Sequence, residues 1–174
     1  MIKYIPNILT SIRIISIPFI VTFFTLNRID LTIIVAIFAA ITDYFDGLIA
    51  RKFNVKSEFG AKLDAVSDKF FAIGLLIALS IKYPILLISL CFELIISIIN
   101  LYIYYKTKKT KSLFIGKIKT WSLFLTVILG FIAYFNYKFI IIMNIFLVIT
   151  IILQIISIIC YIKRLTKTNK LLKN

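Results

Sequence analysis

Six apolar runs account for most of this chain, and each is long enough to cross a membrane as a single helix. A helix needs about 20 residues to span a hydrocarbon core of ~30 Å. The chain is 61% hydrophobic with a mean hydropathy of +1.05, which is typical of membrane proteins rather than soluble domains. We therefore predict an all-α integral membrane protein, a bundle of six transmembrane helices. The expected spans lie near Ile8–Leu26, Leu31–Ala50, Ala61–Ile81, Pro84–Tyr105, Lys117–Phe135 and Phe139–Ile162.

Composition argues against several other classes of protein. The net charge is +14, but the basic residues gather in short segments between the apolar runs. We expect no nucleic-acid binding, because that function needs a basic face on a soluble scaffold. Cys91 and Cys160 both lie within apolar runs, which argues against a disulfide framework or a zinc site. The chain has no His, so any catalysis must use carboxylates, Lys, Arg, Tyr or hydroxyls.

The basic residues also predict how the chain lies in the membrane. Lys and Arg are frequent after the second, fourth and sixth runs, whereas the segments after the first, third and fifth carry only Arg28, Lys82 and Lys138. Loops rich in Lys and Arg stay in the cytoplasm. We therefore expect a multi-pass protein of the cell membrane with both termini in the cytoplasm.

Four of the seven acidic residues lie within the second and third runs, where charge is costly. One charged side chain in the middle of a membrane helix costs about 2.5–3.5 kcal/mol on insertion scales. Asp43 and Asp46 share an arc of about 100° on the second helix with two small residues. Asp64 and Asp68 are four residues apart and share a face of the third helix. We expect a helical hairpin to bring these faces together at the cytoplasmic boundary.

Two interpretations of the aspartates are open. They could pair with Arg51, Lys62 and Lys69 and simply reach water at the helix ends. Four carboxylates on convergent faces, with small residues beside them, instead favour two hard divalent cations about 3.5–4 Å apart that bind phosphate oxygens. The residues alone thus indicate phosphoryl-type chemistry at a membrane surface. A divalent-cation or proton transporter is the alternative from another class, although the outer halves of the runs are nearly all apolar.

This pattern resembles the signature of the CDP-alcohol phosphatidyltransferases, D-x2-D-G-x2-A-R-x8-G-x3-D-x3-D. The chain has every signature residue at the family's spacing: Asp43, Asp46, Gly47, Ala50, Arg51, Gly60, Asp64 and Asp68. The small size and the six-run layout also match, so the resemblance implies one family domain over residues 1–174. It implies an enzyme that transfers a phosphatidyl group from CDP-diacylglycerol to a small alcohol and releases CMP.

The resemblance also implies a role for each signature residue. Asp43, Asp46 and Asp64 would bind two divalent cations, Mg²⁺ or Mn²⁺. Asp68 would be a further metal ligand and the general base that deprotonates the acceptor hydroxyl. The CDP part of the donor would be bound by Gly47, Ala50, Arg51 and Gly60. The implied partners are CDP-diacylglycerol, the acceptor alcohol, membrane lipids and a second copy of the chain in a homodimer, with the active site at the cytoplasmic face.

The acceptor is the least determined part of the prediction. The segments Pro6–Pro18 and Gly116–Thr120 resemble the branch of the family that uses glycerol 3-phosphate. In that resemblance Arg13, Lys117 and Lys119 would hold the acceptor phosphate. That branch usually has Pro directly after the third aspartate, where this chain has Ala65. Inositol phosphate, serine or a lipid alcohol are therefore alternative acceptors.

Glu93 is the other carboxylate deep inside an apolar run, and the sequence assigns it no role. It could contact a polar residue such as Asn100, close the helix bundle, or face a second copy of the chain.

Overall fold

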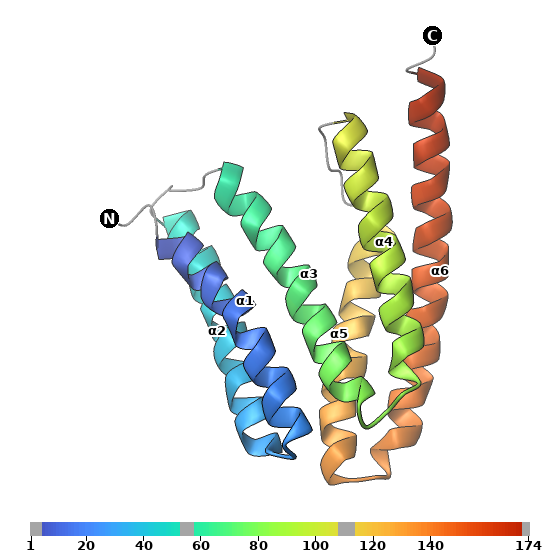
Figure 1. Ribbon diagram of the computed structural model, residues 1–174. Helices are drawn as coiled ribbons and strands as arrows, with labels where there is room; N and C mark the ends of the chain where they lie inside the picture. Colours follow the sequence, from blue (N-terminus) through green and yellow to red (C-terminus); the bar gives the residue numbers. More distant parts are fainter. Residues whose placement is uncertain (1–4, 53–57, 108–113, 172–174) are drawn as a thin grey trace. The chain divides into compact units, whose positions relative to one another are not determined.

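Six helices make up the part of the chain that the computed structural model describes, residues 5–52, 58–107 and 114–171 (Figure 1). Side chains are described there except at positions 5–7, 46, 49–52, 58–59, 61–62, 107 and 167–171. These ranges contain no strand, so the predicted all-α class is confirmed. The helices are α1 Ile5–Thr25, α2 Ile29–Lys52, α3 Glu58–Ser80, α4 Leu86–Thr107, α5 Phe114–Phe135 and α6 Phe139–Leu171.

Four of these helices, α1, α4, α5 and α6, are long and apolar enough to cross a membrane. The qualifying stretches are Ile8–Thr25, Leu86–Lys106, Phe114–Phe135 and Phe139–Thr166. Their exposed positions carry mainly Ile, Leu and Phe side chains, which suit contact with lipid. The chain is thus a multi-pass membrane protein. The crossing of α2 and α3, the two helices that carry the aspartates, stays a prediction.

The observed helix bounds follow the predicted runs closely, with one clear difference. Helix α6 continues to Leu171, well past the predicted end at Ile162. Lys and Arg are good helix formers, and neither Gly nor Pro interrupts this basic segment. The helix therefore extends beyond the apolar run that would lie in the membrane.

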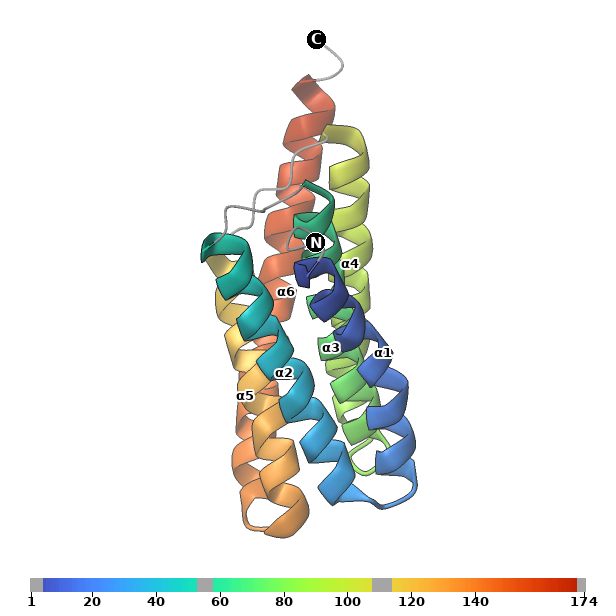
Figure 2. The ribbon, with the colours of Figure 1, turned by 90° about the vertical axis from the view of Figure 1, so that its left-hand side faces the viewer.

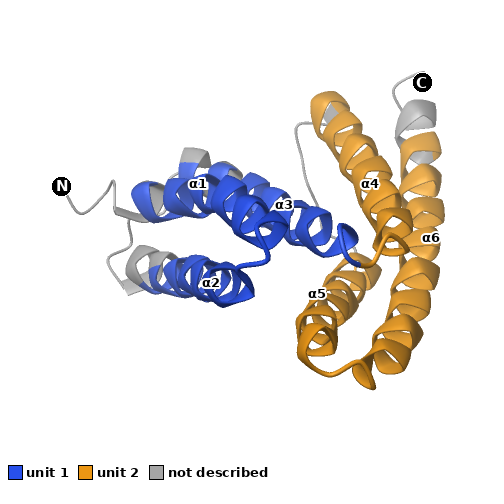
Figure 3. Ribbon diagram, turned by 60° about the horizontal axis from the view of Figure 1, so that its bottom comes forward, with its two compact units in different colours: residues 1–82 blue, residues 83–174 orange. Residues whose placement is uncertain are grey.

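The chain forms two compact units, Met1–Lys82 and Tyr83–Asn174 (Figure 3). In the first unit α1 packs against both α2 and α3, and Figure 2 shows α1 and α2 as a hairpin. In the second unit α6 packs against both α4 and α5. Each unit is therefore a set of three helices with one helix in contact with the other two.

The turn between α1 and α2 sets the register of their hairpin. Asn27 has a left-handed backbone with a φ of 57°, which Asn tolerates better than most residues. The Arg28 N–H donates to the Phe23 carbonyl at 2.9 Å, and the Asn27 N–H donates to the Phe24 carbonyl at 3.1 Å. These two bonds form a Schellman cap, which ends α1. Residues that are a similar number of positions before and after this turn in the sequence therefore lie side by side in the hairpin.

Helices α1 and α3 make a close contact that depends on small side chains. A Cβ atom at Gly74 would collide with Cγ2 of Ile17, so only Gly fits there without a shift. The Ser67 hydroxyl donates to the Thr10 carbonyl oxygen at 3.3 Å. Small residues let membrane helices approach closely, and hydroxyl groups then bond across the contact. These contacts fix α1 against the part of α3 that carries the aspartates.

The core of the second unit contains a polar seam as well as apolar side chains. The Thr150 hydroxyl of α6 is 2.6 Å from the Ser122 hydroxyl and 3.1 Å from the Thr126 hydroxyl, both on α5. Thr126 and Thr150 are fully buried. Hydrogen bonds of this kind between membrane helices add specificity to packing that apolar contacts alone do not select.

Candidate active site

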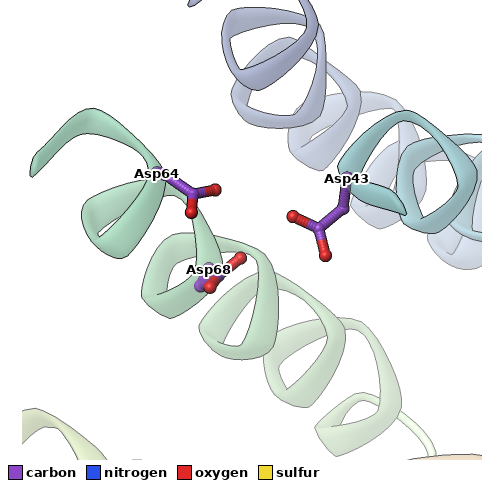
Figure 4. Close-up of side chains that lie close together, drawn as sticks. All are labelled: Asp43, Asp64 and Asp68. Atoms are coloured by element: carbon purple, nitrogen blue, oxygen red, sulfur yellow. The ribbon is translucent and has the colours of Figure 1, made fainter. Parts of the chain in front are cut away.

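Three aspartates meet in the first unit. Asp43 comes from α2, and Asp64 and Asp68 come from successive turns of α3 (Figure 4). One carboxylate oxygen of each lies within 4.8 Å of the others. We call Asp43, Asp64 and Asp68 the aspartate cluster. The fourth predicted ligand, Asp46, is in α2, one turn from Asp43, and its side chain lies outside the described part of the structure.

Arg13 of α1 is bonded to every member of the aspartate cluster. Its Nη2 donates to Asp43 Oδ1. Its Nη1 donates to Asp68 Oδ1 at 2.6 Å and to Asp64 Oδ1 at 3.3 Å. Arg13 is only 1% exposed, so it is a buried cation. The sequence predicts a functional Arg13 but places it at an acceptor phosphate, whereas the structure gives it three carboxylate partners.

The cluster suits hard divalent cations. Its donors are carboxylate oxygens, the ligand type that Mg²⁺ and Mn²⁺ prefer. Three carboxylates against one guanidinium leave an excess of two negative charges among these four side chains. The exposed fractions are 49% for Asp43, 43% for Asp64 and 56% for Asp68. Arg13 therefore covers the cluster from inside the protein, while the carboxylates are open on the other side.

The predicted donor-binding residues lie beside this cluster along the chain. Gly47 is one turn after Asp43 on α2, and Gly60 is one turn before Asp64 on α3. Both glycines are half-buried. Ala50 and Arg51 follow on α2, and their side chains lie outside the described part of the structure. The binding of CDP by these four residues stays a prediction.

The two lysines predicted to hold the acceptor phosphate belong to the second unit and differ sharply from each other. Lys117 is exposed. Lys119 is 5% exposed, and its ammonium group donates to both carboxylate oxygens of Glu93, at 2.5 Å for Oε1. The Gln154 side-chain amide donates to Glu93 Oε2 at 3.3 Å and to the Ser89 carbonyl oxygen at 3.1 Å. Lys119 is therefore already neutralised inside its own unit.

These contacts also answer the question that the sequence leaves open about Glu93. Its partners are Lys119 of α5 and Gln154 of α6, so it links all three helices of the second unit. The signal for this pairing was present in the sequence. Glu93 is the only acidic residue after Asp68 in the sequence, and Lys119 lies near the start of the fifth apolar run. Two opposite charges in neighbouring membrane helices are expected to pair.

The fold and the cluster together define a helical membrane protein with an acidic centre suited to cations. Its sequence matches the family described as CDP-alcohol phosphatidyltransferase over residues 3–161. The chain belongs to the CDP-alcohol phosphatidyltransferase family.

Several curated relatives carry the name CDP-diacylglycerol–glycerol-3-phosphate 3-phosphatidyltransferase. The chain is 41% identical to the one from Rickettsia felis over 83 residues, 46% of this chain and 45% of the relative. It is 46% identical to that from Wigglesworthia glossinidia brevipalpis over 77 residues, 42% of each chain. It is 47% identical to that from Salmonella choleraesuis over 68 residues, 37% of each chain. The matched stretch thus spans less than half the length of these relatives.

Proposed function

We propose that this protein transfers a phosphatidyl group from CDP-diacylglycerol to glycerol 3-phosphate and releases CMP, a step of membrane phospholipid synthesis. The observation that carries the proposal is the convergence of Asp43, Asp64 and Asp68 from two helices in a chain of this family. The names of the relatives support glycerol 3-phosphate as the acceptor. The proposed enzyme is one domain over residues 1–174, and the family match across both compact units supports this.

We propose two divalent cations, Mg²⁺ or Mn²⁺, as its cofactors. Asp43, Asp64 and Asp68 would hold them together with Asp46, which the family signature adds. Bound in this position, such ions would neutralise phosphate charge and make CMP a better leaving group. The negative excess of the aspartate cluster and its open outer side support this assignment.

The protein's own residues then divide the remaining work. Asp68 is the most exposed carboxylate of the aspartate cluster, at 56%, which suits a general base that must reach a substrate hydroxyl. It would take the proton from the acceptor hydroxyl, whose oxygen attacks the lipid-linked phosphorus as the bond to CMP breaks. Donor binding falls to the remaining signature residues, Gly47, Ala50, Arg51 and Gly60.

The acceptor phosphate needs a fixed cation from the protein. Of the predicted residues, Lys117 is exposed and Lys119 is paired with Glu93. Lys117 is therefore the better placed of the two to bind a phosphate from solution, and Lys119 would have to share its charge with Glu93. The contacts of Arg13 favour a different role, which is argued below.

We further propose that both termini and the active site are on the cytoplasmic side, and that the protein works as a homodimer. The excess of Lys and Arg at the C-terminal ends of α2, α4 and α6 and in the segments that follow them supports this orientation. The dimer rests on family resemblance alone.

A CMP-release assay tests the proposed reaction. Purified protein would be given CDP-diacylglycerol, Mg²⁺ and one acceptor at a time: glycerol 3-phosphate, inositol phosphate, serine or phosphatidylglycerol. We expect CMP release with glycerol 3-phosphate and loss of release on chelation of the metal. CMP release with a different acceptor alone would assign that acceptor in place of glycerol 3-phosphate. Release with none of the acceptors would reject the proposed reaction.

A further inference from the structure

We infer that Arg13 is a positioning residue that holds the aspartate cluster in the geometry needed for divalent cations. The inference rests on the proposed metal centre and adds to it a component that is absent from the family signature between positions 43 and 68. It assigns to α1 a function at a site whose carboxylates come only from α2 and α3.

The contacts of Arg13 connect the two helices that supply the carboxylates. Arg13 bonds the Oδ1 atom of each carboxylate and uses both terminal nitrogens to do so. Nη1 joins the two aspartates of α3, and Nη2 joins the aspartate of α2 to them. One planar group thus bridges the two helices that supply the ligands. A carboxylate that is hydrogen-bonded through one oxygen has a defined orientation for its other oxygen, which is how outer partners tune metal ligands.

Electrostatic repulsion within the aspartate cluster gives Arg13 a second function. Three carboxylates with oxygens within 4.8 Å of one another repel strongly, more so near apolar surroundings. Without a counter-charge, the three side chains would separate, and their oxygens would no longer be held close enough to share cations. A guanidinium is always charged and presents several donors in a fixed fork. Arg13 therefore offsets the repulsion before any metal binds.

The packing of α1 on α3 holds Arg13 itself in place, as a positioning residue requires. Arg13 is almost fully buried. Thr10, one turn before it, accepts a bond from Ser67, and Ile17, one turn after it, packs on Gly74. The helix segment that carries Arg13 is thus fixed to α3 on both sides of the guanidinium.

Metal binding itself is the decisive readout. Mn²⁺ would be titrated into purified full-length protein in detergent, and free Mn²⁺ would be followed by electron paramagnetic resonance. We expect Arg13→Gln to weaken Mn²⁺ binding about 10- to 100-fold, the usual effect of losing an outer partner of metal ligands. Arg13→Lys keeps the charge but not the fork, so it should recover only part of this loss.

Two control variants separate positioning from general damage. Thr126→Val removes a buried hydrogen bond between α5 and α6 of the second unit and should leave Mn²⁺ affinity within about twofold of wild type. Arg28→Gln removes an exposed arginine that pairs with Asp30, and it should behave in the same way. Circular dichroism and size-exclusion profiles would establish that each variant is folded.

The possible outcomes are distinct. Unchanged Mn²⁺ affinity in folded Arg13→Gln would overturn the inference, and tighter binding would show that Arg13 competes with the metal instead. Full recovery by Arg13→Lys would overturn the bridging role and leave only a charge effect. Failure of the wild-type protein to bind Mn²⁺ would reject the proposed metal centre itself.

Discussion

The carboxylates of the aspartate cluster lie close enough together that each is expected to bind one or both of the proposed cations. Asp43→Asn or Asp64→Asn keeps the size of the side chain but removes a charged ligand. We expect either variant to lose at least about a hundredfold in CMP release, because metal stabilisation of charge is worth several kcal/mol. Mn²⁺ titration should show weaker binding in the same variants.

A matched control for Asp43→Asn lies on the same helix. Asp30 is in the first turn of α2, and its only described side-chain partner is the exposed Arg28. The hydrogen bond from Arg28 lowers the pKa of the Asp30 carboxyl, yet both side chains are exposed. Asp30→Asn should therefore retain wild-type activity. Equal loss in Asp30→Asn and Asp43→Asn would mean that the assay reports helix damage rather than a cation site.

Asp68 should behave differently from its two neighbours if it is the general base. Asp68→Asn removes the proton acceptor, and general-base catalysis contributes about 10²–10⁴-fold to a rate. We expect a fall of that size in turnover while binding of CDP-diacylglycerol is largely retained. Both quantities can be measured on one preparation, by CMP release and by equilibrium binding of the labelled donor. Complete loss of donor binding would assign Asp68 to ligation alone.

Among the helices, the contact of α1 with α3 depends most on a single small residue. Gly74→Ala places a methyl group against Ile17, and overpacking of this kind costs about 1–3 kcal/mol. We expect a lower thermal midpoint for Gly74→Ala and at least partial recovery when Ile17→Ala removes the Cγ2 atom that the new methyl group would meet. No recovery in the double variant would show that the lost stability does not come from this contact.

The buried ion pair of the second unit gives a further prediction about helix packing. Glu93→Gln or Lys119→Met alone leaves a buried group without its charged partner, which costs about 3–5 kcal/mol. The double variant Glu93→Leu with Lys119→Met removes both charges and should recover most of the stability. Thermal unfolding in detergent measures both effects. A double variant as unstable as the singles would mean that the pair is not the source of the loss.

The same double variant also tests the acceptor site. If Lys119 holds the acceptor phosphate, the stable double variant should show an acceptor KM about 10- to 100-fold higher, since a charged hydrogen bond is worth about 1.5–3 kcal/mol. An unchanged KM would leave Lys119 as a purely structural residue, and Lys117→Ala would then be the variant to measure.

The helices themselves were largely predictable from the sequence, whereas their contacts were only partly so. Long apolar runs with few Gly or Pro residues predict helices, and the spacing of Asp64 and Asp68 predicts a shared face. The contact of Arg13 with Asp43 could have been inferred from the hairpin, because the two residues lie at similar distances from the turn at Asn27. The contact of Arg13 with α3 could not, since it depends on how two helices that are not adjacent in the chain rotate and approach each other.

The orientation of the whole molecule in the membrane is the remaining prediction, and accessible cysteines can test it. In a background without Cys91 and Cys160, new cysteines at Asn27, Lys82 and Asn136 should react with an impermeant reagent added outside the cell. Lys82 and Asn136 are exposed in the structure, whereas Tyr83 beside Lys82 is buried and would make a poor probe.

Cysteines at Lys56, Lys109 and after Lys167 form the opposing set and should react only when the membrane is opened. The basic residues at the C-terminal ends of α2, α4 and α6 and in the segments that follow give the physical reason, because such segments are retained in the cytoplasm. The position at Lys56 matters most, since it lies between the two helices that supply the aspartate cluster. Protection of Lys56 in intact cells would place the aspartate ends of α2 and α3 on the side where glycerol 3-phosphate, a charged solute that does not cross lipid unaided, is available. Labelling of the cysteine at position 56 from outside would mean that the orientation is the reverse of the predicted one. A cytoplasmic phosphorylated acceptor would then be incompatible with this active site.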